Sequence, residues 1–143
     1  MDKHTQRLLE ECNSGCKMAI GSMEQIIEYV QEDRLRTLLE DYKEKHLELE
    51  KESTDMLRGC GKSEKEPGVM ATAFSWFTTE IKMLLQDDSK QVAKIMMNGC
   101  NMGIQSISEY MHEFSGASKE AQALAERLVR MEEDFMKELK QYL

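Results

Sequence analysis

The sequence has little that interrupts a helix and nothing that suggests a membrane span. Its 143 residues include one proline, and aromatic residues make up 6%. No apolar run approaches the ~18 residues that a transmembrane helix needs. Basic residues are fewer than acidic residues: the chain has 19 lysines and arginines and 27 aspartates and glutamates, which gives a formal net charge of −8. An acidic chain without a basic stripe binds nucleic acid or an anionic membrane poorly, so we expect neither as a partner.

Signals for export and for common catalytic mechanisms are missing as well. The first six residues contain no apolar signal core, which predicts a cytoplasmic protein. The sequence has no G-x-S-x-G, P-loop, G-x-G-x-x-G or C-x-x-C motif. In the cytoplasm the cysteines should be reduced unless they bind metal or take part in catalysis. The four cysteines are Cys12, Cys16, Cys60 and Cys100.

Helical periodicity is the main positive signal. Apolar side chains recur every three or four residues in five segments, and no segment alternates with a period of two. Gly59 and Gly61 are typical of a helix end, Pro67 of a first helical turn and Ser118 of an N-cap. The chain is therefore predicted to be all-α, with a single domain over residues 1–143. The apolar stripes lie at 5–30, 35–60, 67–86, 92–114 and 121–142.

The sequence also contains a weak internal repeat. Residues 13–30 align with 97–114 with five identities in 18 positions, and 38–57 align with 124–143 with five in 20. A repeat of helix pairs predicts two antiparallel hairpins, each with an apolar face that it cannot bury alone. Packing the two faces together gives a four-helix bundle. We expect the hairpins at 5–60 and 90–143, joined by a crossover helix at 67–86.

This pattern resembles the ferritin-like superfamily and, more narrowly, a bacterial ferritin-like family of unknown function. The resemblance runs from Leu8 to the C-terminus and rests on residues 12–16, 35–39 and 98–100. It implies a ferritin-like four-helix bundle and no particular reaction. The family commonly has a glutamate after each repeat glycine, and this sequence has Cys16 and Cys100 at those positions.

Four chemically reactive residues are predicted to share one layer at the centre of the bundle. Equal distances from a turn mean equal height in antiparallel helices. Cys16 and His46 lie about 15 residues on either side of the first turn, and Cys100 and Glu132 about 16 on either side of the second. Ferritin-like di-iron proteins need Glu-x-x-His on two helices. Because this chain has Lys43 in place of the first such glutamate, and Val129-Arg130-Met131-Glu132 at the second motif, we expect no di-iron centre.

Two interpretations of the layer remain open. Two thiols, an imidazole and a carboxylate suit one tetrahedral transition metal such as zinc, with Cys16, His46, Cys100 and Glu132 as ligands. Alternatively, the cysteines pack as small hydrophobic residues while His46 and Glu132 hydrogen-bond each other. The corresponding functional hypotheses are a non-catalytic binding or self-associating bundle, and a metal-binding or thiol-redox protein.

Several further residues carry simpler expectations. Glu109 and His112 form a Glu-x-x-His near a helix end, where solvated charges are expected. Cys60 is the thiol expected to be exposed. Trp76 lies off the apolar stripe of its segment, unlike Phe74 and Phe77, which suggests either an edge residue or part of a subunit interface. With the many methionines, it predicts a homodimer. Six methionines are expected to fill gaps in the core, with copper ligation as the alternative; they are Met18, Met23, Met96, Met97, Met102 and Met111.

Overall fold

The protein is helical throughout the described part of the chain. The computed structural model describes residues 2–59, 71–84 and 88–143, with side chains from residue 77 onward in the second range, and these residues contain no strand. The all-α prediction is thereby confirmed. None of the described helices combines the length and the apolar character that crossing a bilayer requires. The helices are α1 (Lys3–Ile27), α2 (Asp33–Arg58), α3 (Ala71–Lys82), α4 (Ser89–Glu113) and α5 (Lys119–Leu139), followed by the 3₁₀ turn η1 (Lys140–Tyr142).

Polar side chains begin three of the helices. The side chains of Asp2, Asp88 and Ser118 each accept a hydrogen bond from a backbone N–H three residues further on, which satisfies one free donor of the first turn. Ser118 is thus the N-cap that the sequence predicted. The first helix ends at Ile27, whereas its apolar stripe in the sequence continues to Val30. Val30 stays 3% exposed outside the helix, and its carbonyl accepts a hydrogen bond from Arg36 at the start of α2.

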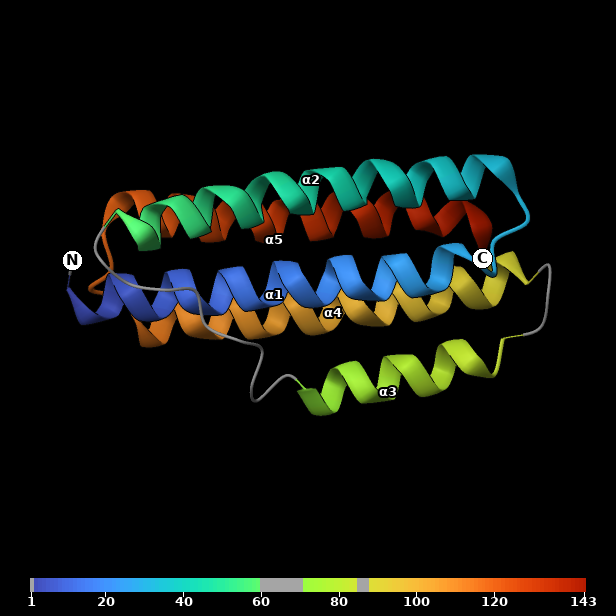
Figure 1. Ribbon diagram of the computed structural model, residues 1–143, viewed down its shortest axis with the longest axis horizontal. Coiled ribbons are helices and arrows are strands. Elements are labelled where there is room, and N and C mark those ends of the chain that lie inside the picture. Colours follow the sequence, from blue (N-terminus) through green and yellow to red (C-terminus); the bar gives the residue numbers. More distant parts are fainter. Residues whose placement is uncertain (1, 60–70, 85–87) are drawn as a thin grey trace.

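The long helices form two antiparallel hairpins that pack side by side (Figure 1). Helices α1 and α2 make one hairpin, and α4 and α5 make the other. Because α2 and α4 run in the same direction, the connection between the hairpins must return along the length of the bundle. Helix α3 belongs to this connection and packs against α1 and α4. Pro67 and Cys60 lie outside the described residues, and so does the Phe74 side chain.

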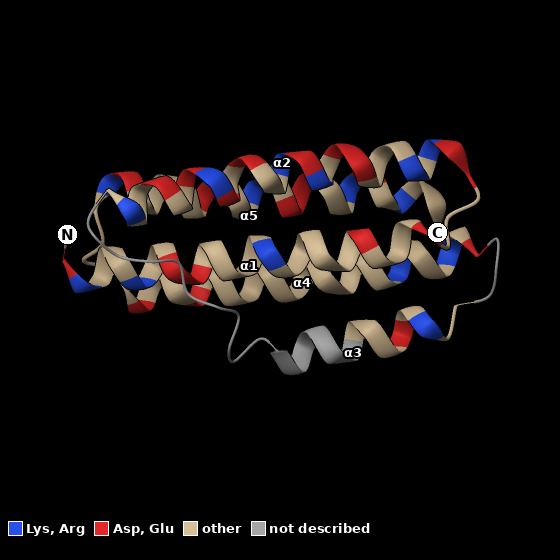
Figure 2. Cartoon of the chain, viewed as in Figure 1, with Lys and Arg blue, Asp and Glu red and all other residues tan. Residues whose placement is uncertain are grey.

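The position of α3 follows from the distribution of charge. Figure 2 shows charged residues along α2 and α5, whereas the middle of α1 and α4 is mostly uncharged. Residues 95–108 of α4 contain no charged side chain, and residues 12–23 of α1 contain only Lys17. Such a surface is costly to leave in water, and α3 covers it with Phe77 and Ile81, which are 4% and 2% exposed. The crossover helix therefore completes the core.

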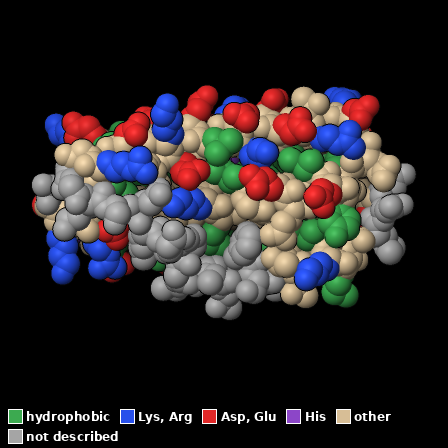
Figure 3. All heavy atoms as spheres, in the orientation of Figure 1, with side chains coloured by type: hydrophobic (Ala, Val, Ile, Leu, Met, Phe, Trp, Pro, Cys, Tyr) green, Lys and Arg blue, Asp and Glu red, His purple; other side chains and the backbone are tan. Residues whose placement is uncertain are grey.

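The described residues form two apolar clusters in the interior. One is near the α1–α2 turn and includes Ile26, Leu39 and Phe135, and the other is near the α4–α5 turn and includes Leu8, Leu49 and Leu128. His46 and Glu132 are buried and belong to neither cluster. The surface shown in Figure 3 mixes Lys and Arg with Asp and Glu, with small hydrophobic patches between them.

Candidate functional site

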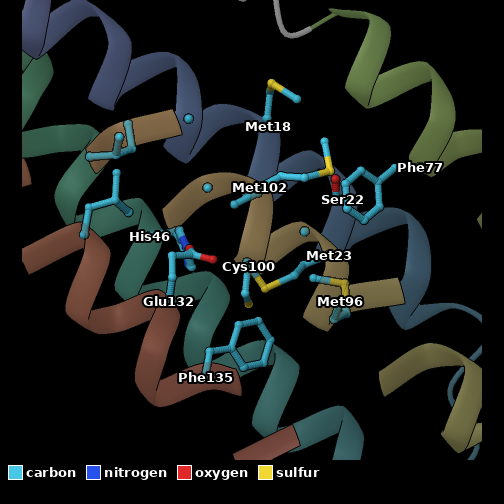
Figure 4. Close-up of a pocket in the computed structure, with 16 residues that line it drawn as sticks. Met18, Ser22, Met23, His46, Phe77, Met96, Cys100, Met102, Glu132 and Phe135 are labelled. Carbon is cyan, nitrogen blue, oxygen red and sulfur yellow. The ribbon is translucent and has the colours of Figure 1, made fainter. Parts of the chain in front are cut away.

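A buried histidine and a buried glutamate meet at the centre of the bundle. His46 on α2 is 1% exposed, Glu132 on α5 is 7% exposed, and His46 Nε2 contacts Glu132 Oε1 directly (Figure 4). The other ring nitrogen, Nδ1, lies 2.6 Å from the backbone carbonyl of Tyr42. Counting residues from the two turns predicted this height for both residues. The prediction that His46 faces the core is confirmed.

The pair holds one proton between its two contacting atoms. A carbonyl oxygen can only accept, so His46 Nδ1 must donate its N–H to Tyr42. The Nε2–Oε1 contact then needs a second proton, which makes the pair an imidazolium with a carboxylate or a neutral imidazole with a carboxylic acid. Burial lowers the pKa of His46, but the hydrogen bond and charge of Glu132, with the Tyr42 carbonyl, outweigh burial and raise it. The balance favours the imidazolium.

The buried thiols are held in their protonated form. Burial raises the pKa of Cys100, and the charge of Glu132 and a hydrogen bond from the thiol to its carboxylate raise it further. Burial also raises the pKa of Cys16, and it raises that of Cys12 to about 12. The thiolate is the form that attacks electrophiles and binds metals. At neutral pH these cysteines therefore behave as small apolar side chains.

The predicted four-residue layer is brought together in part. His46 and Cys100 both contact Glu132, and Cys16 is fully buried within the cluster near the α4–α5 turn. Within residues 2–59, 71–84 and 88–143, no group of three or more histidine, cysteine, aspartate or glutamate residues is arranged to hold a metal ion. A single bound metal at Cys16, His46, Cys100 and Glu132 therefore stays a prediction without support from this geometry.

A cavity of about 60 Å³ adjoins the His46–Glu132 pair. It lies among α1, α4 and α5, while α2 contributes His46 and α3 contributes Phe77 to its wall (Figure 4). Most of its lining is apolar, with Phe77 and Phe135 joined by four methionines. The methionines are Met18, Met23, Met96 and Met102.

Small residues make room for this cavity. Gly15, Ala19 and Ser22 lie three or four residues apart on α1, and Gly99 and Gly103 are four apart on α4, and all five line the cavity. A Cβ atom at Gly99 would lie 2.6 Å from Phe77 Cζ, so only glycine lets the Phe77 ring approach. The spacing of small residues is a sequence signal that could have predicted a close approach or a void here.

Among the described residues of the wall, three polar side chains interrupt the apolar surface, and one of them has no hydrogen-bond partner in this part of the chain. Glu132 and His46 pair with each other, as described above. Ser22 is 4% exposed, lines the cavity and makes no hydrogen bond within the described part of the chain. Figure 4 places its hydroxyl beside Phe77 and Met102. Periodicity alone did not single out Ser22.

Other predicted residues fall outside this site. Glu109 and His112 are exposed, as expected of solvated charges near a helix end. Cys60 lies outside the described residues, and so does the Trp76 side chain, so neither expectation is tested. Neither a family model nor a curated protein nor a solved structure matches this chain.

Proposed function

We propose that the protein is a non-catalytic ferritin-like bundle that binds a small molecule in the cavity beside His46 and Glu132. The observation that carries the proposal is the cavity itself, which lies at the layer where a ferritin-like protein has its reactive centre. Concave, largely apolar sites with a few polar groups are typical of small-molecule binding.

The ferritin-like part of the proposal is supported by topology and by the internal repeat. Helices α2 and α4 are parallel and are joined by a connection that includes α3, as in bundles with one long crossover. The repeated Gly–Cys pairs, Gly15-Cys16 and Gly99-Cys100, lie on α1 and α4. Two copies of one helical hairpin would produce this arrangement.

The non-catalytic part is supported by the chemistry of the layer. Oxygen chemistry at two irons needs several carboxylates, and here one carboxylate, Glu132, is already engaged by His46. The neighbouring thiol of Cys100 is protonated and donates to that same carboxylate. These groups satisfy one another, which favours a packed binding wall over a redox or metal centre.

The test is a titration monitored by the methyl groups of methionine. Protein labelled with ¹³C at these methyl groups is purified without metal affinity steps and titrated with small neutral organic molecules. Signals of the cavity methionines should shift saturably, while that of Met83, which is 74% exposed, should not. An Ala19→Leu variant, which places a larger side chain in the cavity wall, should abolish the shifts. Unchanged spectra together with a stoichiometric metal by elemental analysis would contradict the proposal and favour the metal-binding alternative.

A further inference from the structure

The geometry points to a small neutral alcohol as the ligand class of this cavity, with its hydroxyl group hydrogen-bonded to Ser22. This inference rests on the proposed function, because it names what the same cavity binds. It depends on three properties of the wall: one unpaired hydroxyl, an adaptable apolar surface and a buried carboxylate.

The Ser22 hydroxyl group is the polar group of the wall that a ligand can hydrogen-bond. A hydroxyl group that faces a cavity without a protein partner can still form a hydrogen bond with a ligand, so a ligand that supplies the partner gains affinity. Ser22 is 4% exposed and without a hydrogen bond in the described part of the chain, and its side chain lines the cavity. A ligand hydroxyl can both donate to and accept from Ser22, so it suits this position in either orientation.

The remainder of the ligand should be apolar and small. The thioether side chains of Met18, Met23, Met96 and Met102 are flexible and fit irregular apolar shapes. The volume of about 60 Å³ is several times the ~10–15 Å³ that one water needs and well below the ~150 Å³ of a cavity that holds benzene. A molecule with a few carbon atoms matches this size.

The charge distribution of the cavity wall disfavours an acidic ligand. Glu132 lines the same cavity, and a Cβ atom at Gly103 would lie 3.7 Å from its Oε2 atom, so this oxygen borders the space beside α4. His46 already neutralises Glu132, and none of the described residues that line the cavity is a lysine or an arginine. An anionic ligand would therefore lose its hydration without gaining a cation.

Three probes that share one branched four-carbon skeleton test the inference: isobutanol, isobutyl chloride and isobutyrate. The readout is again the ¹³C-methyl spectrum of the methionines, with the exposed Met83 as the internal control. Isobutanol should shift the cavity signals saturably, and isobutyrate should not shift them. In a Ser22→Ala variant, isobutanol should bind about 2- to 10-fold more weakly, the effect of one hydrogen bond. The affinity of isobutyl chloride should stay the same or rise.

The outcomes separate the inference from the proposed function. Equal affinity of isobutanol for the wild type and for Ser22→Ala would overturn the inference and leave the binding cavity in place. Tight binding of isobutyrate would also overturn it. If none of the three probes shifts the cavity methionines, the proposed function fails as well. Unchanged helical circular dichroism and an unchanged Met83 signal show that the Ser22→Ala variant is folded.

Discussion

Removing His46 should destabilise the protein more than its size suggests. In His46→Ala the carboxylate of Glu132 stays buried, 7% exposed, and loses its contact with the imidazole. Removing one partner of a buried pair costs about 3–5 kcal/mol, because the remaining charge is uncompensated. That is a large part of the ~5–15 kcal/mol by which domains are typically stable. A Glu132→Gln variant keeps the shape and can still donate to a neutral His46, so it should cost less.

The pair should also make stability depend on pH in a defined direction. The pKa of His46 is raised in the folded protein relative to its value of ~6.5 in an unfolded chain. The contribution of His46 is therefore fully present below pH ~6.5 and is lost as the pH rises through the higher pKa of the native state. His46→Ala should lack this loss. Because the two proteins differ only at this residue, the difference between the two curves isolates His46.

Urea denaturation followed by circular dichroism measures both effects. The control is a double variant, His46→Leu with Glu132→Leu, in which no buried charge remains. It should be close to wild type in stability, since an apolar pair of suitable volume often replaces an ion pair without loss. If His46→Ala changes the free energy of unfolding by less than about 0.5 kcal/mol, as surface substitutions do, the account of the central pair is wrong.

Three further predictions concern packing, thiols and assembly. Gly15→Ala should raise the free energy of unfolding by up to about 1 kcal/mol, because its Cβ makes ordinary contacts at 3.8 and 4.0 Å. Gly99→Ala should instead lower the free energy of unfolding by about 1–3 kcal/mol in the same urea assay, because the added Cβ displaces the Phe77 ring. Equal effects of the two substitutions would contradict this packing. In a Cys60→Ser background, Ellman's reagent should modify the remaining thiols only on unfolding, and rapid reaction of the native protein would show them to be accessible. We also propose a dimer, which sedimentation at high micromolar concentration tests; a monomer there would count against it.

Much of the fold could be predicted because helices impose a regular spacing. Periodicity of apolar side chains identified all five helical segments, and counting from the two turns placed His46 and Glu132 at one height. That count works because an α-helix rises by a fixed amount per residue. Apolar periodicity did not locate the end of the first helix. Val30 continues the apolar stripe but is buried as part of the turn, where Arg36 holds its carbonyl.

The cavity could not be predicted from periodicity, because a void depends on how several elements fit together. Ser22 and Ala19 come from α1, Gly103 from α4 and Phe77 from α3, and no single stripe contains them. The spacing of the methionines predicts core filler; Met18, Met23 and Met96 are buried, and Met97, Met102 and Met111 are partly buried. Their role in lining a space needed the packing of α3 over α1 and α4.

A crystal structure of the protein, purified without metal affinity steps and soaked in isobutanol, tests the central claim most directly. The account predicts His46 Nε2 in contact with Glu132, and ligand density in the cavity with its hydroxyl beside Ser22. Diffraction data collected across the absorption edges of zinc, iron and copper should contain no anomalous peak at this layer. A metal peak bonded to His46 and Cys100, or a cavity closed by side chains and empty of isobutanol, would contradict the account.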